Sequence, residues 1–329
     1  MTFKYKNVYL GETATVTGPY EEQGPLSRFF DKSYQEFYFG SKTWEQAESK
    51  LLEESIEILL NKMSKSKQDI DVLISGDLSN QLSSTNYAAT NLHMPLIGIY
   101  GACSTSCLGI LLASNMIDKK QIKDAIVSVS SHNNAAEKQF RQPVEYGGPK
   151  PKTATFTVTG GASCYLSGER SNIKVTSATL GIPIDMGIKD AFHMGAVMAP
   201  AAAETIMEHL RNTYQDINDY DLILTGDLGR YGKDILKDYL INEYGIEANN
   251  IDDAACMIYN LDKQKVYAGG SGPACLPLVT YGYILNKMNK KMLKKVLLVA
   301  TGALMSLATV NEKMSIPAIA HAVSLEVVE

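Results

Sequence analysis

A cysteine beside two apolar segments is the residue of this sequence best suited to chemistry. Cys103 begins the predicted buried helix CSTSCLGILLASNMI (103–117), directly after the predicted strand PLIGIYG (95–101). A thiol at a helix N-terminus meets free backbone N–H groups and the positive end of the helix dipole, so its pKa should fall. The thiolate could accept an acyl group, and the same N–H groups could hold a carboxylate instead. The alternative is a small buried thiol without chemistry.

Alternating helix and strand patterns position this cysteine. Apolar residues recur at helical spacing over 43–63, and DVLIS (71–75) and AIVSVSS (125–131) are typical of buried strands. TATFTVTGGASCYLSGE (153–169) predicts a strand, a glycine pair and a returning strand. Helices that alternate with strands predict βαβ units and a mostly parallel sheet.

The second part of the chain has the same pattern. Pro200 is expected to open a helix, since proline is favoured at the first helical position. An amphipathic helix over 231–245 should close at Gly245. The remaining predicted elements are a strand, a Gly-rich turn with a buried helix, and a strand: DLILT (221–225), GGSGPACLPLVTYGYIL (269–285) and KVLLVATG (295–302).

The chain contains an internal duplication. DVLISGDL (71–78) matches DLILTGDL (221–228), and AIVSVSS matches KVLLVAT. GACSTSCL (101–108) matches GGSGPACL (269–276), which sets Cys103 against Ser271. Three matches in the same order predict an α/β protein of two similar halves, 1–170 and 171–329, packed as one body.

Composition excludes several classes of protein. A net charge of −5 argues against a strong nucleic-acid binder, which would carry a basic stripe. The five cysteines are odd in number and irregularly spaced, which favours reduced thiols over a disulfide framework. The N-terminal residues lack the apolar core of a signal peptide.

One stretch without Asp, Glu, Lys or Arg, from His93 to Met116, is near the length of a membrane span. Pro95, Gly98 and Gly101 interrupt it. A buried strand, a turn and a buried helix explain it better.

The duplicated α/β pattern with a cysteine before a buried helix resembles the thiolase superfamily. Within that superfamily the chain most resembles the stage V sporulation protein AD family. The segments that carry this resemblance are GDLSNQ (76–81), GACSTS (101–106), SSHNNAAEKQFRQPVEYGG (130–148), MAPAA (198–202), TGDLGRYG (225–232), ATGALMS (300–306) and IPAIAHAVSLE (316–326).

The resemblance implies an αβαβα layered fold of two halves with mixed sheets. It also implies a homodimer that binds dipicolinic acid and takes part in moving it, with calcium, into the developing spore. Such a protein would act as a peripheral protein of the spore inner membrane, beside membrane proteins of the same stage V sporulation operon. No resident cofactor or metal is expected.

The second half lacks the catalytic helpers of a condensing enzyme. Thiolase-type enzymes supply a His, with an Asn or second His, from two loops that here carry Asp227 and Ser271-Gly272. An ionised carboxylate offers no proton and repels the developing oxyanion. The sequence therefore predicts a protein that binds a ligand without transforming it.

A dianionic ligand needs hydrogen-bond donors and cations. Arginine and lysine side chains can bind the carboxylates of the ligand, and histidines at strand ends can line a pocket. Aspartate carboxylates can bind calcium carried by the ligand. His209 is expected at the surface and His321 in the core, and the histidines form no metal-binding motif. The predicted ligand-binding residues are Cys103, Ser104, Thr105, Asp77, His132, Lys138, Arg141, His193, Met194, Asp227, Arg230, Ser271 and Gly272.

Two alternatives stay open. The first is a thiolase-type acyltransferase or condensing enzyme that uses Cys103 as its nucleophile. The second is a purely structural subunit of a spore membrane complex, which should expose an apolar patch.

Overall fold

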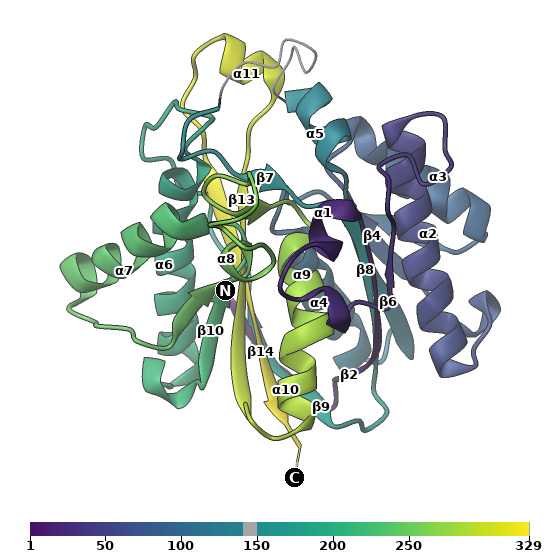
Figure 1. The fold of residues 1–329 in the computed structure, drawn as a ribbon. Helices are drawn as coiled ribbons and strands as arrows, with labels where there is room; N and C mark the ends of the chain where they lie inside the picture. The colour runs from purple at the N-terminus through teal and green to yellow at the C-terminus, as the bar shows by residue number, and fades with distance from the viewer. Residues whose placement is uncertain (141–149, 329) are drawn as a thin grey trace.

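The chain folds into αβαβα layers in the computed structural model, which describes residues 1–140 and 150–328. Figure 1 shows one pair of helices outside each half of the sheet, and a third group between the halves. The outer pairs are α2 (Trp44–Met63) with α3 (Ser83–Leu92), and α6 (Met194–Thr213) with α7 (Gly229–Tyr244). The central helices are α4 (Thr105–Asp118), α9 (Cys275–Val279) and α10 (Leu285–Asn289).

The two halves join in one mixed, 12-stranded sheet, whose main path runs β11-β10-β13-β14-β9-β2-β8-β6-β4-β5. The first half supplies β2 (Tyr9–Thr17), β4 (Leu73–Gly76), β5 (Leu96–Gly98), β6 (Asp124–Ser131) and β8 (Gly160–Ser167). The second supplies β9 (Ile173–Thr179), β10 (Leu222–Thr225), β11 (Ile251–Asp253), β13 (Lys295–Ala303) and β14 (Ala318–Val327). The short strands β1 (Thr2–Lys4) and β3 (Lys32–Ser33) pair beside this path.

Strand order supports the predicted duplication. Strand β4 pairs in parallel with β5 and β6, and β6 pairs antiparallel with β8. In the second half, β10 pairs in parallel with β11 and β13, and β13 pairs antiparallel with β14. The halves meet where Tyr9 and Leu10 of β2 pair with Lys174 and Ile173 of β9.

Helix α4 is apolar nearly all round because both halves bury it. Its buried residues belong to a core cluster that also contains side chains of β6, β9, β13 and β14. The charge-free stretch 93–116 therefore runs through β5 and α4. Its helix is buried as predicted, but the prediction of a buried strand is wrong, because β5 ends the main path of the sheet and is half-exposed. In the part of the chain that the structure describes, no helix is long and apolar enough to cross a membrane.

Two other local predictions are wrong. Pro200 lies inside α6, which begins six residues earlier, at Met194. His193 is the N-cap residue of α6, and its ring nitrogen accepts the Ala196 N–H. The segment 153–169 is not a hairpin: β7 (Phe156–Thr157) leaves the main sheet and pairs in parallel with β12 (Gly270–Ser271). That pairing brings the Gly-rich turn of the second half beside the first half.

Candidate ligand-binding site

A tight turn between β5 and α4 holds Cys103. Ala102 has a left-handed backbone, with φ of 50°, a conformation that costs a non-glycine residue roughly 1–2 kcal/mol. Local bonds hold it: the Ser104 hydroxyl donates to the Gly101 carbonyl at 2.6 Å, and the Thr105 hydroxyl donates to the Ala102 carbonyl at 2.6 Å. Ser104 and Thr105 thus use their hydroxyl protons within the turn, and their predicted role as ligand donors stays a prediction.

The second half packs directly against this turn. A Cβ atom on Gly302 of β13 would lie 2.4 Å from the Gly101 carbonyl oxygen and 3.2 Å from the Ser104 nitrogen. Only glycine permits that approach, so β13 fixes the backbone on both sides of Cys103.

Cys103 is 7% exposed and lines a small inner chamber of about 40 Å³. The space is slightly larger than that of a single water molecule, roughly 30 Å³ in the liquid. Four predicted residues meet at its wall: Cys103 from the first half, and Met194, Ser271 and Gly272 from the second. The sequence interpretation missed the others: Leu78, Tyr100, Ala102, Ala136, Glu137, Phe140, Thr157, Ala303 and Met305.

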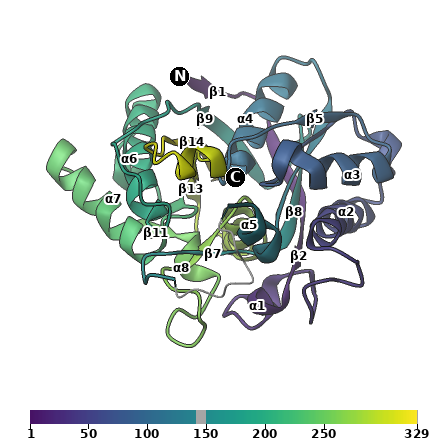
Figure 2. The same ribbon diagram turned by 90° about the horizontal axis from the view of Figure 1, so that it is seen from above.

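A larger outer chamber of about 530 Å³ adjoins the inner one, and both are lined by Leu78, Ala136 and Phe140. This volume lies within the roughly 300–1,000 Å³ of ordinary ligand pockets. Helix α5 (Asn133–Phe140) contributes Lys138, whose ammonium lies 2.7 Å from Glu45 Oε1 of α2. Figure 2 shows α5 near the middle of the molecule seen from above.

The predicted residue Asp77 supports the wall of the site without lining it. One of its oxygens accepts the Ser79 N–H at 2.6 Å, and the other accepts the Thr85 N–H at 2.7 Å. Burial raises its pKa, and the hydrogen bonds from Thr85 and Ser79 act in the opposite direction. It therefore orients the backbone groups of Ser79 and Thr85.

Asp227 is fully buried, and neither of its oxygens has a hydrogen-bond partner. Burial, followed by the nearby carboxyl of Asp253, raises its pKa well above the usual range. The Gly272 N–H lowers that pKa in part but does not complete a hydrogen bond. Asp227 therefore holds a proton, and it borders neither chamber.

No histidine lines either chamber in the described ranges 1–140 and 150–328. His132 is buried after β6, where its Nδ1 accepts the Asn134 N–H at 3.2 Å and its Nε2 donates to the Phe37 carbonyl at 2.8 Å. Burial lowers its pKa to about 4, so the ring is neutral. His193 is half-buried as the N-cap of α6 and packs edge-on against Tyr231.

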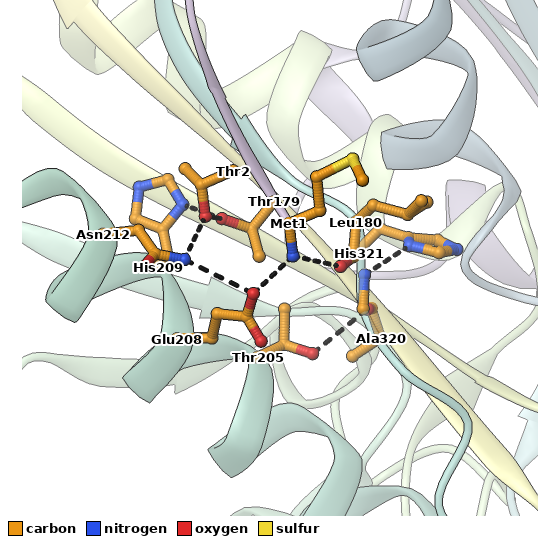
Figure 3. A network of polar contacts seen from close by, with 11 residues as sticks. Met1, Thr2, Thr179, Leu180, Thr205, Glu208, His209, Asn212, Ala320 and His321 are labelled. Carbon is orange, nitrogen blue, oxygen red and sulfur yellow. Dashed lines mark hydrogen bonds and ion pairs between the residues drawn. The ribbon is translucent and has the colours of Figure 1, made fainter.

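His209 is buried, and the prediction that it lies at the surface is wrong. Its Nδ1 contacts the Thr179 hydroxyl at 2.8 Å, as Figure 3 shows, and its Nε2 contacts the Tyr220 hydroxyl at 3.0 Å. His321 is buried as expected, and its Nδ1 accepts the Gly181 N–H at 3.2 Å. Burial lowers the pKa of each ring to about 4. The network joins α6 to strands β1, β9 and β14, and its residues line neither chamber.

One predicted cation, Arg230, lines neither chamber. Arg230 begins α7, where its guanidinium donates to the Leu261 carbonyl at 3.5 Å. Arg141 lies outside the described residues. Among the residues that are described, no group of three or more His, Cys, Asp or Glu side chains is placed to hold a metal ion.

The fold and the cysteine turn define a thiolase-like protein. OleA from Xanthomonas campestris aligns over 98% of this chain and 99% of its own, with a TM-score of 0.61 and 13% identity. The 3-oxoacyl-[acyl-carrier-protein] synthase III of Aquifex aeolicus aligns over 97% and 99%, with a TM-score of 0.60 and 12% identity. At such identities the likeness concerns the fold.

Sequence similarity places the chain in a narrower family within this class. The model of the stage V sporulation protein AD (SpoVAD) family matches residues 1–326. Stage V sporulation protein AD of Bacillus subtilis (strain 168) is 45% identical over 319 residues, which cover 97% of this chain and 94% of that protein. This chain belongs to the stage V sporulation protein AD family.

Proposed function

We propose that this protein binds dipicolinic acid, free or with calcium, and takes part without enzymatic chemistry in its uptake into the developing spore. Membership of the sporulation family over nearly the whole chain carries the proposal. The two adjoining chambers at Cys103 supply a site of suitable volume.

The shapes of the chambers favour one orientation of the ligand. The inner chamber, at about 40 Å³, admits a single small group such as a carboxylate, whereas the outer chamber accepts the pyridine ring. The Lys138 ammonium borders the outer chamber and pairs there with Glu45 at a half-exposed position. Such exposed pairs contribute at most about 1 kcal/mol, so a ligand carboxylate can replace Glu45 at small cost.

The composition of the walls argues against condensation. Among the described residues, the walls contain a thiol but no histidine, and the buried Asp227, whose pKa is raised well above its usual range, lines neither chamber. Thiolysis and condensation need a donor placed at the developing oxyanion. Cys103 therefore serves as a small wall residue here and not as an acyl carrier.

The test is calorimetric titration of the full chain with dipicolinic acid, with and without calcium, and with picolinic acid as the monocarboxylate control. We expect saturable binding of dipicolinic acid that is about tenfold tighter than that of picolinic acid, since one charge-assisted hydrogen bond is lost. Lys138→Ala should weaken binding by a similar factor, whereas Lys65→Ala, away from both chambers, should not. Absence of binding under either condition would reject the proposal, and covalent labelling of Cys103 by acyl-CoA would favour the enzyme.

A second function, docking onto a membrane-associated assembly, is favoured by an exposed apolar patch. The patch lies on segments 180–193 and 304–317, which are joined by a hydrogen bond from the Ile316 N–H to the Ile188 carbonyl at 2.8 Å. Monomeric proteins rarely expose several large apolar side chains together without an interaction. Four large apolar side chains are exposed on these two segments, and we define them together as the patch: Ile182, Met186, Phe192 and Met314.

In this second role the protein sits at the spore inner membrane beside membrane proteins of the stage V operon. Replacing Met186 and Phe192 together by glutamate should move it out of the membrane fraction of sporulating cells and leave dipicolinate affinity unchanged. Tyr214→Glu is the matched control, because Tyr214 is 91% exposed outside the patch. If the double variant stays in the membrane fraction to the same extent as wild type, the patch is not the docking surface.

The homodimer implied by the thiolase resemblance has a suitable edge. Strand β5 ends the main path of the sheet, and unpaired strand edges favour pairing with another chain. Exposed tyrosines, Tyr87 and Tyr100, flank this edge. Sedimentation equilibrium should give twice the chain mass of 36.0 kDa, and a monomer at every concentration would contradict the dimer.

A further inference from the structure

Glu48 is a buried acid that faces the outer chamber. It lies on α2, is 2% exposed, and forms part of the chamber wall. Its Oε1 accepts a hydrogen bond from the Ser130 hydroxyl at 3.3 Å, and its other oxygen has no hydrogen bond within the described structure. Among the other buried acids of the described residues, Glu137 lines the inner chamber and is paired with Lys150, whereas Glu21, Asp77, Asp124, Asp227 and Asp253 line neither chamber.

The charges around Glu48 come from several elements. Asp77, after β4, and Glu45, on the same helix, both disfavour its ionised form. On α5, Lys138 is paired with Glu45, and Glu137, which lines the inner chamber, is paired with Lys150. His132, after β6, is neutral. Burial first, then Asp77, raises the pKa of Glu48 well above its usual range.

We propose that Glu48 keeps its proton in the free protein and donates it, as a hydrogen bond, to a carboxylate of the anionic ligand in the outer chamber. This inference rests on the proposed function and assigns a specificity-determining residue to the same site. A carboxylic acid that donates to a carboxylate selects anions without placing a net positive charge on the protein. No covalent bond forms, and the proton stays between the two oxygens.

Binding then depends on pH in a defined direction. Ordinary carboxyl groups of a ligand are ionised above about pH 4, so changes at higher pH come from the protein. Below the pKa of Glu48 the affinity is constant. Above it, each bound ligand requires the uptake of one proton, so the dissociation constant rises about tenfold per pH unit.

A bound cation would produce the opposite effect. Calcium coordinated by Glu48 would require the ionised carboxylate, so binding would release a proton and tighten as pH rises. The sign of proton exchange therefore separates an anion held by the protonated acid from a metal held by the carboxylate.

The experiment is calorimetric titration with dipicolinic acid from about pH 5 to about pH 9, in buffer pairs with different ionisation enthalpies. Wild type should take up as much as one proton per ligand and lose affinity at high pH. Glu48→Gln, which still offers an N–H donor, should bind within about threefold of the low-pH wild type and show no pH dependence. Glu57→Gln, on the exposed side of the same helix, should behave as wild type.

Each other outcome has a distinct meaning. Binding that is independent of pH in wild type, or a pH slope that survives in Glu48→Gln, overturns the role of Glu48 and leaves the binding function intact. Proton release overturns it in favour of a cation site. Absence of binding at every pH rejects the proposed function and this inference with it. The proton count of wild type decides the matter even if Glu48→Gln does not fold.

Discussion

The same three residues, Gly-Asp-Leu, stand at the ends of the matching strands β4 and β10, yet their surroundings differ. A Cβ atom on Gly76 would lie 2.0 Å from the Ile99 carbonyl oxygen, whereas a Cβ atom on Gly226 would meet nothing closer than Leu276 Cβ at 3.4 Å. Asp77 accepts two backbone hydrogen bonds, and Asp227 accepts none. The Gly-Asp-Leu sequence is therefore closely packed and hydrogen-bonded to the backbone in the first half only.

Another carboxylate has taken that role in the second half. Asp253, the last residue of β11, accepts bonds from the Thr225 hydroxyl at 2.6 Å and from the N–H groups of Leu228, Gly229 and Ala255 at 3.0–3.1 Å. Asp227 has no hydrogen-bond partner in the core. The half that carries Cys103 is tightly constrained around its turn, while the other half retains a protonated acid with no bonding function.

The largest expected difference is between the two glycines. Gly76→Ala should lower the free energy of unfolding by about 3 kcal/mol, because the new methyl group collides with the rigid backbone of Ile99. Gly226→Ala should change it by less than about 1 kcal/mol, because its contacts are of ordinary length. Urea unfolding of both variants measures this, and equal losses would show that the two loops are equally constrained.

Asp77→Ala should lower the free energy of unfolding by about 2 kcal/mol, because it leaves the buried N–H groups of Ser79 and Thr85 without an acceptor. The change at the matching residue of the second half, Asp227→Ala, breaks no hydrogen bond. Chemical denaturation should therefore give a much lower free energy of unfolding for Asp77→Ala than for Asp227→Ala. The reverse ranking would contradict the assignment of Asp77 as the structural carboxylate.

Asp227→Asn should stabilise the protein at neutral pH by about 1 kcal/mol, because the amide needs no proton to remain buried. The raised pKa of Asp227 means that the folded state holds a proton that the unfolded state has released. Its contribution to stability is complete below about pH 4 and is lost as pH rises toward the folded pKa. The variant should lose less stability than wild type between acid and neutral pH, and parallel pH profiles would contradict the buried proton.

Glu21 is intermediate, since one oxygen is bonded and the other is not. Its Oε1 accepts from the Thr159 N–H at 3.0 Å and from the Tyr259 hydroxyl, while Oε2 has no partner. Burial raises its pKa from 4.5 to about 7, so its contribution to stability declines as pH rises across that interval. Glu21→Gln keeps both bonds and removes the titrating group. Its thermal-unfolding midpoint should therefore change by a few degrees less than that of wild type between about pH 5 and pH 7. A midpoint profile identical to wild type would place the titration elsewhere.

Much of the fold could be predicted because local patterns agree with tertiary packing. The apolar runs 71–75, 125–131 and 221–225 form β4, β6 and β10 within a few residues, and Gly245 ends α7 in the left-handed conformation as expected. Strands β9 and β14 carry weaker patterns and were not predicted. Their place in the sheet depends on pairing between distant segments, which no local pattern encodes.

The site was predictable at the turns of the duplicated segments and not elsewhere. Cys103, Ser271 and Gly272 were found because the repeat aligns their loops, and Met305 follows the third matched strand in the same way. Glu48 was missed because a charged residue in an amphipathic helix is ordinarily solvated. His209 was misplaced for the same reason, since its partners Thr179 and Tyr220 come from other elements.

The measurement that tests the central claim most directly is the affinity of dipicolinic acid for Cys103→Met and Cys256→Met, determined by calorimetry beside wild type. The longer side chain at position 103 would fill the inner chamber of about 40 Å³, whereas Cys256 borders neither chamber. We predict that Cys103→Met weakens binding at least about tenfold with an unchanged unfolding midpoint, and that Cys256→Met binds as wild type. Equal affinities for all three proteins would contradict the placement of the ligand at Cys103.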